Sequence, residues 1–529
     1  MSKIKRALIS VSEKKGVVDF AKGLEKLGVE IISTGGTAKV LRENGIKIRA
    51  ISDVTGFPEM LSGRVKTLHP KIHGGILARR SDRGHMKQVK DHRIGLIDMV
   101  VVNLYPFEDT VRNPKVKLED AVEMIDIGGP AMIRSAAKNF NDVAVLCNPD
   151  RYLCVLMELQ KNDCALSEET RQALAVEAFG HTAKYDAAIY AFLSGRFARS
   201  KDKFPEILHL VFERAQGLRY GENPHQKAAF YADSIKPAYG FGGMKQVHGK
   251  ELSFNNFLDL HSAVQIAKDF ESPTVCVVKH NSPCGVASST KLDNAYRDAF
   301  NCDSLSAFGG IVGLNRKVDV KTAKAIFDSG FLECIIAPAY DAGALKILTE
   351  RKNLRIIEYR DMDTGSRNSG KGTDREIYSC DVKKIEGGLL LQEQDELEVK
   401  MSDLKTVTKR TPSASQIKTL LFAWKVAKHV RSNAIVIAKG ERTIGIGGGQ
   451  PSRVDSVKIA VRKAGNEIKG ACLATDGFFP KPDSVQLAGK AGIAAIMQPG
   501  GSIKDEDSIE AADKAKIAMV TTGIRHFRH

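Results

Sequence analysis

Short apolar runs, each ending in a turn of polar residues and glycine, recur along the sequence. Ala7–Val11 is the first run, and a helical periodicity over Gly16–Leu27 separates it from the second, Val29–Ile32. Met99–Leu104 is apolar almost throughout, as is typical of a strand that is buried on both faces. This alternation of strands and helices predicts an α/β fold with a compact first domain.

The pattern changes twice along the chain. Residues 151–199 have helical periodicity, and the charged stretch Lys201–Pro205 interrupts it, so we predict a domain boundary near residue 200. Beyond it, residues 275–280 and 434–438 each predict a strand followed by a turn and a helix. These two stretches would belong to two related subdomains.

The charge balance favours small anionic ligands over nucleic acid. The 529 residues include 79 Lys and Arg against 63 Asp and Glu, a formal net charge of +16, and this excess is spread along the chain. A single Trp and 6% aromatic residues leave few side chains for base stacking. An inactive nucleic-acid-binding protein on an enzyme-like scaffold remains an alternative, which a steep salt dependence of duplex binding would support.

The sequence predicts a protein of the cytoplasm. Its apolar runs are all shorter than the roughly 18 residues that a membrane span needs, and the start moves directly into a strand-like stretch. Nine cysteines without a C-x-x-C pair are typical of reduced thiols. We therefore expect no membrane contact, no disulfide and no cysteine-based zinc site.

Two polar loops follow strands of the first domain. One is Ser10–Lys14, and the other is Ser33–Thr37, which lies directly before a predicted helix. Hydroxyl groups and glycine amides at a helix N-terminus bind anions, and Arg64 and Lys66 add two cations. One such loop would be an ordinary helix cap, whereas two loops favour a phosphate pocket.

Three further motifs are weaker. Asp126 lies at a predicted strand-to-helix turn with Lys138 on the helix behind it, so the two form either an acid/base pair or a cap with a surface charge. His69 and His73 have zinc-motif spacing, but Pro70 disfavours a helix through both and no metal is expected. Gly445–Gln450 lacks the last glycine of a dinucleotide fingerprint, so we expect it to let the backbone approach a ligand or a partner chain.

Lys279 and His280 form the sharpest candidate site. They end an apolar strand, the place where open α/β sheets carry their chemistry. A histidine there can transfer protons near neutral pH, and a neighbouring ammonium stabilises negative charge. A buried structural histidine is the alternative, and lysine rarely suits such surroundings. Cys284 with Pro283 is similar to part of the zinc deaminase signature, but position 287 is Ala, so no zinc is expected.

The motifs together resemble, from end to end, the family of bifunctional purine biosynthesis proteins. This family joins aminoimidazole carboxamide ribonucleotide (AICAR) formyltransferase to IMP cyclohydrolase. The segments that carry the resemblance are SGRVKTLHPKIHGGIL, NLYPF, LRYGENPHQ, KHNSPCGVA, SAFGG, KHVRSNAIVIAKG and FFPKPDS.

The resemblance implies a domain organisation. Residues 1–200 would form the cyclohydrolase, an α/β domain with a doubly wound, methylglyoxal-synthase-like core over about 1–148 and a helical segment behind it. Residues 201–529 would form the transferase from two α/β subdomains that resemble cytidine deaminases without their zinc. The family implies a homodimer with shared transferase sites, 10-formyltetrahydrofolate as co-substrate and no catalytic metal. A nucleotide sensor that binds without turnover is the other alternative.

The resemblance also implies roles for individual residues. Catalysis would fall to Lys66, Tyr105, Asp126, Lys138, Lys279 and His280. The IMP site would be formed by Ser10, Ser12, Lys14, Thr34, Gly35, Gly36, Thr37, Arg64, Thr67, Asn103, Ile127 and Gly128. AICAR and folate would be bound by Arg219, Tyr220, Phe308, Gly309, Glu333, Asn433, Arg453, Val454, Phe478, Asp483, Ser502 and Arg525.

Overall fold

The computed structural model describes residues 3–113, 115–197, 204–233, 240–360 and 380–529. Within them the chain forms two compact units, and the change from unit 1 to unit 2 falls between Val211 and Phe212. Helix α10 (Glu168–Phe197) is one continuous element of 30 residues that belongs to unit 1. The division therefore comes later than residue 200, because the polypeptide continues with unit 1 beyond the end of this helix.

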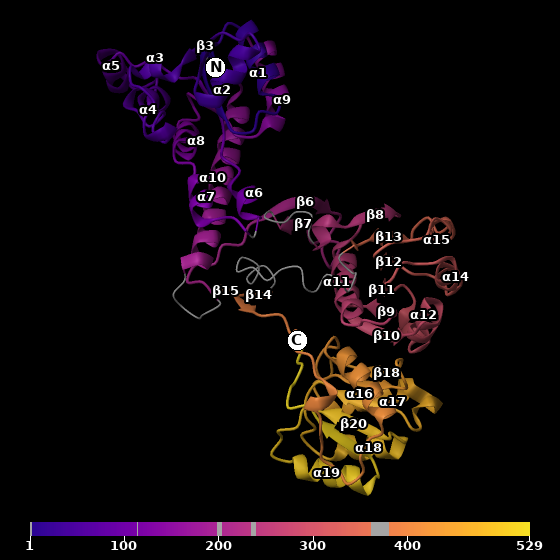
Figure 1. The fold of residues 1–529 in the computed structure, drawn as a ribbon. Helices are drawn as coiled ribbons and strands as arrows, with labels where there is room; N and C mark the ends of the chain where they lie inside the picture. The colour runs from indigo at the N-terminus through magenta and orange to yellow at the C-terminus, as the bar shows by residue number, and fades with distance from the viewer. Residues whose placement is uncertain (1–2, 114, 198–203, 234–239, 361–379) are drawn as a thin grey trace. The chain divides into compact units, whose positions relative to one another are not determined.

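Unit 1 contains a five-stranded sheet in which every pair of neighbours is parallel (Figure 1). In spatial order its strands are β3 (Ile48–Ala50), β2 (Glu30–Ser33), β1 (Arg6–Val11), β4 (Met99–Asn103) and β5 (Ala144–Leu146). All five residues of β4 are buried, as its apolar sequence predicts. The strand order reverses between β1 and β4, and in open parallel sheets the ligand binds beside the carboxyl ends of the two strands at such a point.

Helices cover both faces of this sheet. Leu8 packs in an apolar cluster with residues of α8 and α10, whereas its neighbour Ile9 packs in a second cluster with residues of α1 and α9. Successive side chains of a strand point to opposite faces, which explains this division. The helices of unit 1 besides α10 are α1 (Val17–Lys26), α2 (Gly35–Glu43), α3 (Ile51–Thr55), α4 (Pro70–Leu77), α5 (Arg83–Asp91), α6 (Phe107–Val111), α7 (Leu118–Glu123), α8 (Gly128–Lys138) and α9 (Tyr152–Lys161), with the short turns η1 (Leu61–Gly63) and η2 (Pro149–Arg151).

Unit 2 is built around two six-stranded mixed sheets. The first has the order β10 (Ser282–Ser288), β9 (Thr274–Lys279), β11 (Ile311–Leu314), β12 (Cys334–Ala337), β13 (Arg355–Glu358) and β8 (Lys245–His248). The second has the order β18 (Thr443–Gly447), β17 (Ile435–Ala438), β19 (Cys472–Thr475), β20 (Ala495–Gln498), β21 (Ala518–Thr521) and β16 (Lys405–Thr406). The sequence of parallel and antiparallel pairings is the same in both sheets, so the two halves of unit 2 are topological copies, as the predicted related subdomains require.

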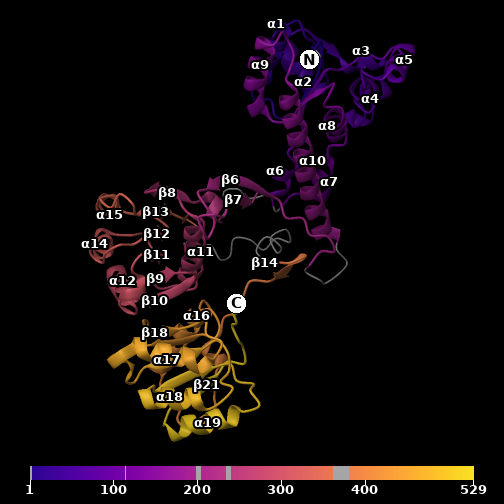
Figure 2. The same ribbon diagram turned by 180° about the vertical axis from the view of Figure 1, so that it is seen from behind.

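Each sheet of unit 2 packs against its own helices. In the first half α11 covers one face and α12, α14 and α15 lie on the other, as both views show (Figures 1 and 2). The helices are α11 (Phe254–Lys268), α12 (Leu292–Asn301), α13 (Ser304–Ala307), α14 (Val320–Asp328), α15 (Ala342–Leu348), α16 (Ala414–Ala427), α17 (Arg453–Ala464), α18 (Asp483–Ala491) and α19 (Asp505–Lys514), with η3 (Gly240–Gly243), η7 (Met401–Asp403) and η8 (Gly465–Ile468). Two separate hairpins complete the unit, namely β6 (Phe212–Leu218) with β7 (Ala228–Asp233) and β14 (Asp381–Ile385) with β15 (Gly388–Gln392).

The strand–turn–helix prediction is wrong at both places in unit 2. Strand β9 turns directly into the antiparallel strand β10, and β17 does the same into β18. Apolar runs alone do not distinguish a parallel strand that leads into a helix from a buried hairpin strand. Lys279 and His280 therefore lie at a hairpin turn.

The two halves of unit 2 meet along their edge strands. The buried hydroxyl of Thr443 accepts a hydrogen bond from Val286 N at 2.9 Å and donates one to Val286 O at 3.1 Å. Ala287 and Arg442 form an antiparallel bridge beside it. Because β10 and β18 run in opposite directions at this bridge, the turn before β10 and the loop after β18 face the same end of the unit.

Candidate functional site

The first polar loop of unit 1 is held by the end of β4. The side-chain oxygen of Asn103 accepts hydrogen bonds from Ser12 N at 2.5 Å and Glu13 N at 3.0 Å, and Asn103 Nδ2 donates to Glu13 O at 3.1 Å. Thr37 in α2 donates to Val11 O at 2.9 Å. The loop after β1 is thus fixed between β4 and α2, beside the reversal in strand order.

Two lysines converge on this loop. Lys14 Nζ donates to Thr37 Oγ1 at 3.2 Å, and partial burial together with the nearby charge of Lys66 lowers the pKa of the Lys14 ammonium. Lys66 Nζ lies at the start of α2, 3.4 Å from where a Cβ on Gly35 would be. The first turn of α2 exposes Gly35 and Gly36. Exposed amides at a helix N-terminus, beside two ammonium groups, form a site for a phosphate group.

Asp126 lies just before α8 and faces the same lysine. Its Oδ1 accepts a hydrogen bond from Gly129 N at 2.8 Å, and Asp126 N donates to the hydroxyl of Tyr185 at 2.8 Å. Burial raises the pKa of the Asp126 carboxyl, although the Gly129 amide and the positive charge of Lys66 act in the opposite direction. Thr67 lies against Gly128. Lys66 is therefore near both the N-terminus of α2 and the carboxyl group of Asp126.

The remaining predicted residues of this site differ in their contacts and exposure. Arg64 pairs with Glu123, and the hydroxyl of Thr34 donates to Glu59 Oε1 at 2.9 Å. Tyr105 and Ile127 have 40% and 61% of their surface exposed, which leaves both available to a ligand. Ser10 is the partly exposed residue near the end of β1.

Lys138 is not brought to Asp126 within one chain. It is the last residue of α8, so about 15 Å of helix separates it from the N-terminus of α8, where Asp126 lies. Lys138 instead borders an apolar groove of about 690 Å³ beside Arg134 and Phe179. Asp126 precedes the helix that Lys138 ends, so the two residues lie at opposite ends of α8.

The Lys279–His280 pair occupies the turn of the β9–β10 hairpin. Lys279 Nζ donates to Phe308 O at 2.7 Å and lies near Gly309. His280 is exposed, so it is not the buried structural histidine that was the alternative. Asp259 of α11 accepts hydrogen bonds from the turn, from Asn281 N at 2.6 Å and from His280 N at 3.3 Å.

Other predicted transferase residues lie in the same half of unit 2. The ring of Phe308 contacts that of Phe331 in a tilted arrangement with the ring centres 5.6 Å apart, and Glu333 forms an ion pair with Arg355 at 2.5 Å. Arg219 follows strand β6 and stacks at 4.8 Å on Tyr220, whose hydroxyl accepts a hydrogen bond from it at 3.0 Å. The Glu333 carboxylate is therefore already paired, whereas Arg219 is exposed.

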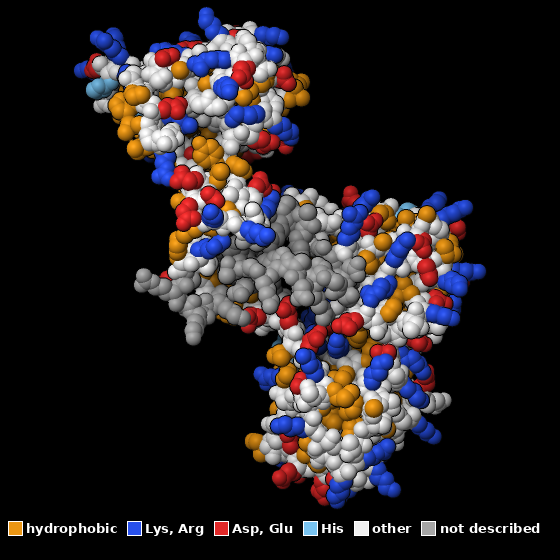
Figure 3. Space-filling view, in the orientation of Figure 1, with side chains coloured by type: hydrophobic (Ala, Val, Ile, Leu, Met, Phe, Trp, Pro, Cys, Tyr) orange, Lys and Arg blue, Asp and Glu red, His pale blue; other side chains and the backbone are white. Residues whose placement is uncertain are grey.

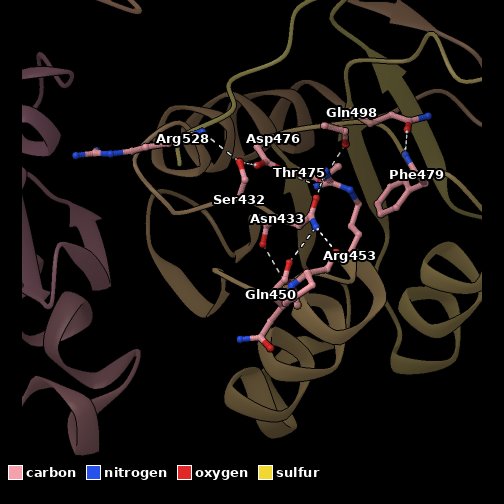
Figure 4. A network of polar contacts seen from close by, with 12 residues as sticks. Ser432, Asn433, Gln450, Arg453, Thr475, Asp476, Phe479, Gln498 and Arg528 are labelled. Atoms are coloured by element: carbon pink, nitrogen blue, oxygen red, sulfur yellow. Dashed lines mark hydrogen bonds and ion pairs between the residues drawn. The ribbon is translucent and has the colours of Figure 1, made fainter. Parts of the chain in front are cut away.

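The second half of unit 2 contains a buried polar network around Arg453 (Figure 4). The Arg453 guanidinium donates to Asn433 Oδ1 at 2.7 Å, to Thr475 Oγ1 at 2.5 Å and to Asp476. Asn433 Nδ2 in turn donates to the carbonyls of Gln450 and Pro451 at 2.9 and 3.0 Å. Only 5% of the Arg453 side chain is exposed, so its guanidinium orients Asn433.

A small cavity lies beside this network, and several polar residues line it. It has a volume of about 360 Å³ and is lined by Ser432, Asn433, Gly449, Gln450, Pro451, Phe527 and His529. Arg525 stacks at 4.7 Å on Phe527. The C-terminal segment is therefore docked, and His526 N donates to Asp476 O at 3.0 Å. Phe478 and Asp483 are exposed, and Val454 and Ser502 are half-buried.

Removal of the Asp476 carboxylate should destabilise unit 2. Asp476 is fully buried opposite Arg453, and Asp476→Ala would leave an unpaired guanidinium in the interior. We expect a loss of about 3–5 kcal/mol in the free energy of unfolding. Urea unfolding followed by fluorescence of Trp424, the single tryptophan, reports on this unit.

The matched control is Asp455→Ala in α17, the helix that begins with Arg453. Asp455 forms an exposed pair with Lys458, and such pairs contribute less than about 1 kcal/mol. Equal shifts in the urea midpoint for the two variants would contradict the structural role of the buried pair.

Two other motifs have structural roles. His69 caps α4 by accepting from Lys71 N at 3.1 Å, with Pro70 in the tolerated first position of the helix. In the segment Gly445–Gln450, a Cβ on Gly445 or Gly447 would collide with the backbone of α17 of the same chain. The glycines let strand β18 pack closely on this helix. Gly449 and Gln450 instead border the cavity beside Arg453, so the approach of a ligand or a partner chain to this segment stays a prediction.

Two properties of the described part of the chain concern metal and membrane. Among the residues that the structure describes, no group of three or more His, Cys, Asp or Glu side chains could hold a metal ion. Across the same residues, no helix is long and apolar enough to cross a membrane. Positive and negative side chains are interspersed on the face shown in Figure 3.

Comparisons with known proteins agree with this architecture. A model of the MGS-like domain matches residues 16–131, and a model described as AICARFT/IMPCHase bienzyme matches residues 136–463. The bifunctional purine biosynthesis proteins PurH of Thermoanaerobacter sp. (strain X514) and Acetivibrio thermocellus are each 51% identical, over 99% of this chain and 100% of their own length. PurH of Bacillus cereus (strain B4264) is 50% identical over the same shares. A solved structure titled "Crystal structure of ForH" is 36% identical over 35% of this chain and 97% of its own, with a TM-score of 0.32.

The fold and the two groups of polar residues define a two-unit α/β enzyme. The bienzyme model alone covers more than half of the chain, and the PurH relatives match it over nearly its full length. The chain belongs to the AICARFT/IMPCHase bienzyme family.

Proposed function

We propose that unit 1 carries the IMP cyclohydrolase activity of this bifunctional enzyme and that unit 2 carries its AICAR formyltransferase activity. The observation that carries the first assignment is the phosphate cradle of Lys14, Lys66 and the α2 N-terminus, which faces the carboxyl group of Asp126. Together the two reactions transfer a formyl group to AICAR and close formyl-AICAR to IMP. We propose residues 1–200 as the cyclohydrolase and residues 201–529 as the transferase, a boundary that lies close to the division between the two units at Phe212.

Ring closure requires proton transfer and stabilisation of negative charge. The carboxamide nitrogen of formyl-AICAR attacks the formyl carbonyl, and water leaves after proton transfer. Lys66 would stabilise the oxyanion that develops on the formyl oxygen, and Asp126 would exchange the proton. The raised pKa of the Asp126 carboxyl suits a group that must both accept and return a proton. Tyr105 and Lys138 are proposed as further catalytic groups from the family resemblance alone.

Formyl transfer requires a base, because the attacking amine of AICAR is conjugated and weakly nucleophilic. His280 would take the proton from this amine, and Lys279 would stabilise the transition state. The exposed position of His280 at the hairpin turn supports this role. Arg219, Tyr220, Asn433 and Arg525 would hold the nucleotide, and Arg453 would act by orienting Asn433.

The formyl donor is derived from folate, as AICAR formyltransferase activity implies. We identify it as 10-formyltetrahydrofolate, and we propose that neither reaction uses a metal. Val454, Asp483 and Ser502 would contact the folate, and the exposed ring of Phe478 stands near the start of α18, which Asp483 begins.

The two halves of unit 2 are proposed to be cytidine-deaminase-like subdomains without zinc. Their repeated strand order supports a shared ancestry. The enzyme is proposed to act in the cytoplasm as a homodimer whose transferase sites combine residues of two subunits.

Turnover of both substrates tests the function. The purified protein is incubated with AICAR and 10-formyltetrahydrofolate, and IMP and tetrahydrofolate are measured by mass spectrometry and absorbance. IMP with tetrahydrofolate is the expected result. Formyl-AICAR without IMP would contradict the assignment of unit 1, and nucleotide binding without any turnover would favour the sensor alternative.

Subunit mixing tests the shared transferase sites. The proposed shared site combines His280 of one subunit with Asn433 of the other, and His280→Ala and Asn433→Ala chains should each be inactive as transferases. Their heterodimer should recover activity, because one of its two sites then carries neither substitution. The transferase rate of a refolded mixture is compared with that of each variant alone. A mixture no more active than its components would contradict shared sites.

A further inference from the structure

The turn that carries His280 has an unusual backbone. His280 and Asn281 both lie in the left-handed region, with φ of 54° and 58°. Two consecutive residues of this kind form the tight turns that suit the twist of a hairpin, where Asn and Gly are preferred. Histidine tolerates this region less well than glycine does. An interaction from outside the turn is therefore expected to hold this conformation.

Asp259 supplies that interaction from helix α11. Its Oδ1 accepts a hydrogen bond from Asn281 N at 2.6 Å, and its Oδ2 accepts one from His280 N at 3.3 Å. One turn further along α11, the hydroxyl of Ser262 donates to Asn281 Oδ1 at 3.3 Å. A single carboxylate thus bonds to both backbone donors of the turn, and the helix behind it fixes the carboxylate in place.

The Asp259 carboxyl and the Lys279 ammonium lie in different local environments. Asp259 is half-buried, and burial raises the pKa of its carboxyl, while the two turn amides and the charges of His280 and Lys279 act in the opposite direction. The Lys279 ammonium is held separately by Phe308 O at 2.7 Å. His280, the proposed proton acceptor, and Lys279, the proposed cation, are therefore held by different hydrogen bonds. Of the two, only His280 donates its backbone amide to Asp259.

We propose that Asp259 is the positioning residue of the transferase site. Its carboxylate holds His280 and Asn281 in the left-handed turn and so directs the His280 imidazole toward the substrate. The inference rests on the proposed role of His280 as the proton acceptor. Asp259 itself does not touch the reacting atoms.

Substitution of Asp259 should lower the turnover number without loss of substrate binding. Asp259→Ala removes both acceptors, and a misplacement of a catalytic group by about 1 Å can cost on the order of 10²-fold. We expect the transferase kcat to fall by roughly 10- to 100-fold, with the KM for AICAR little changed. Asp259→Asn should be intermediate, because its amide can accept from Asn281 N but turns a donor toward His280 N.

The matched control is Asp319→Ala in the same half of unit 2. Asp319 also accepts a hydrogen bond from a backbone amide, Thr322 N at 2.7 Å, but at the start of α14. The Asp319→Ala variant should leave the transferase kcat unchanged. The cyclohydrolase rate with formyl-AICAR, measured on every variant, should also remain that of the unsubstituted enzyme.

A rescue experiment separates positioning from a general loss of structure. Glycine adopts a positive φ without steric cost, so the turn should form more readily when residue 281 is glycine. Adding Asn281→Gly to Asp259→Ala should therefore restore part of the lost kcat. An unchanged kcat in Asp259→Ala, a loss expressed only in KM, or no recovery in the double variant would each overturn the proposal. If His280→Ala itself keeps full transferase activity, the assignment of His280 fails instead, and the two failures are distinguishable.

Discussion

His280→Ala should lower the transferase rate by roughly 10²- to 10⁴-fold, the usual contribution of a positioned general base. The amine of AICAR cannot lose its proton to solvent fast enough once the imidazole is gone. His280 lies exposed at the β9–β10 turn, so alanine leaves no cavity and the fold should persist. The measurement is tetrahydrofolate release at saturating AICAR and 10-formyltetrahydrofolate.

The cyclohydrolase activity of the same protein is the control. The variant should convert formyl-AICAR to IMP at the rate of the unsubstituted enzyme, because unit 1 has its own sheet and its own apolar clusters. A parallel loss of both activities would indicate a folding defect. An unchanged transferase rate would remove His280 from the mechanism.

Asp126→Asn should abolish most of the cyclohydrolase activity, with an expected loss of roughly 10²- to 10⁴-fold. The asparagine oxygen can still accept from Gly129 N, so the start of α8 keeps its cap while the exchangeable proton is lost. IMP formation from formyl-AICAR is measured by mass spectrometry. The transferase rate should stay the same.

Asp120→Asn is the matched control for this substitution. Asp120 is an exposed carboxylate in the first turn of α7, and its amide variant should leave both activities unchanged. A cyclohydrolase that tolerates Asp126→Asn as well as Asp120→Asn would show that Lys66 and the phosphate cradle suffice for ring closure.

The local pattern of the sequence correctly predicted the parallel sheet of unit 1. The apolar residues of β4 and the polar loops after β1 and β2 follow from a periodicity within a few positions. The loop Ser10–Lys14 and the turn Ser33–Thr37 do come together, because parallel strands place their carboxyl ends at the same edge. The assignment of catalytic roles stays a prediction.

Other features depend on contacts between distant residues. Asn103 binds the loop at Ser12 across 91 positions, and Asp259 reaches Asn281 across 22. Asp259 was missed because a single carboxylate in a helix gives no local signal of its partner. Arg453 was predicted to bind substrate, and only the fold shows that Asp476 and Asn433 already bond to its guanidinium.

The sequence by itself determined the family and supplied the candidate groups of both sites, since motif identity depends on residues that lie next to one another. The tertiary structure decided how these groups meet. It showed that two predicted strand–helix units are hairpins, it placed Lys138 at the end of α8 away from Asp126, and it supplied the strand order that the two predicted subdomains share. The physical reason is that strand pairing and helix placement depend on hydrogen bonds and burial between distant segments, which no local pattern of side chains encodes.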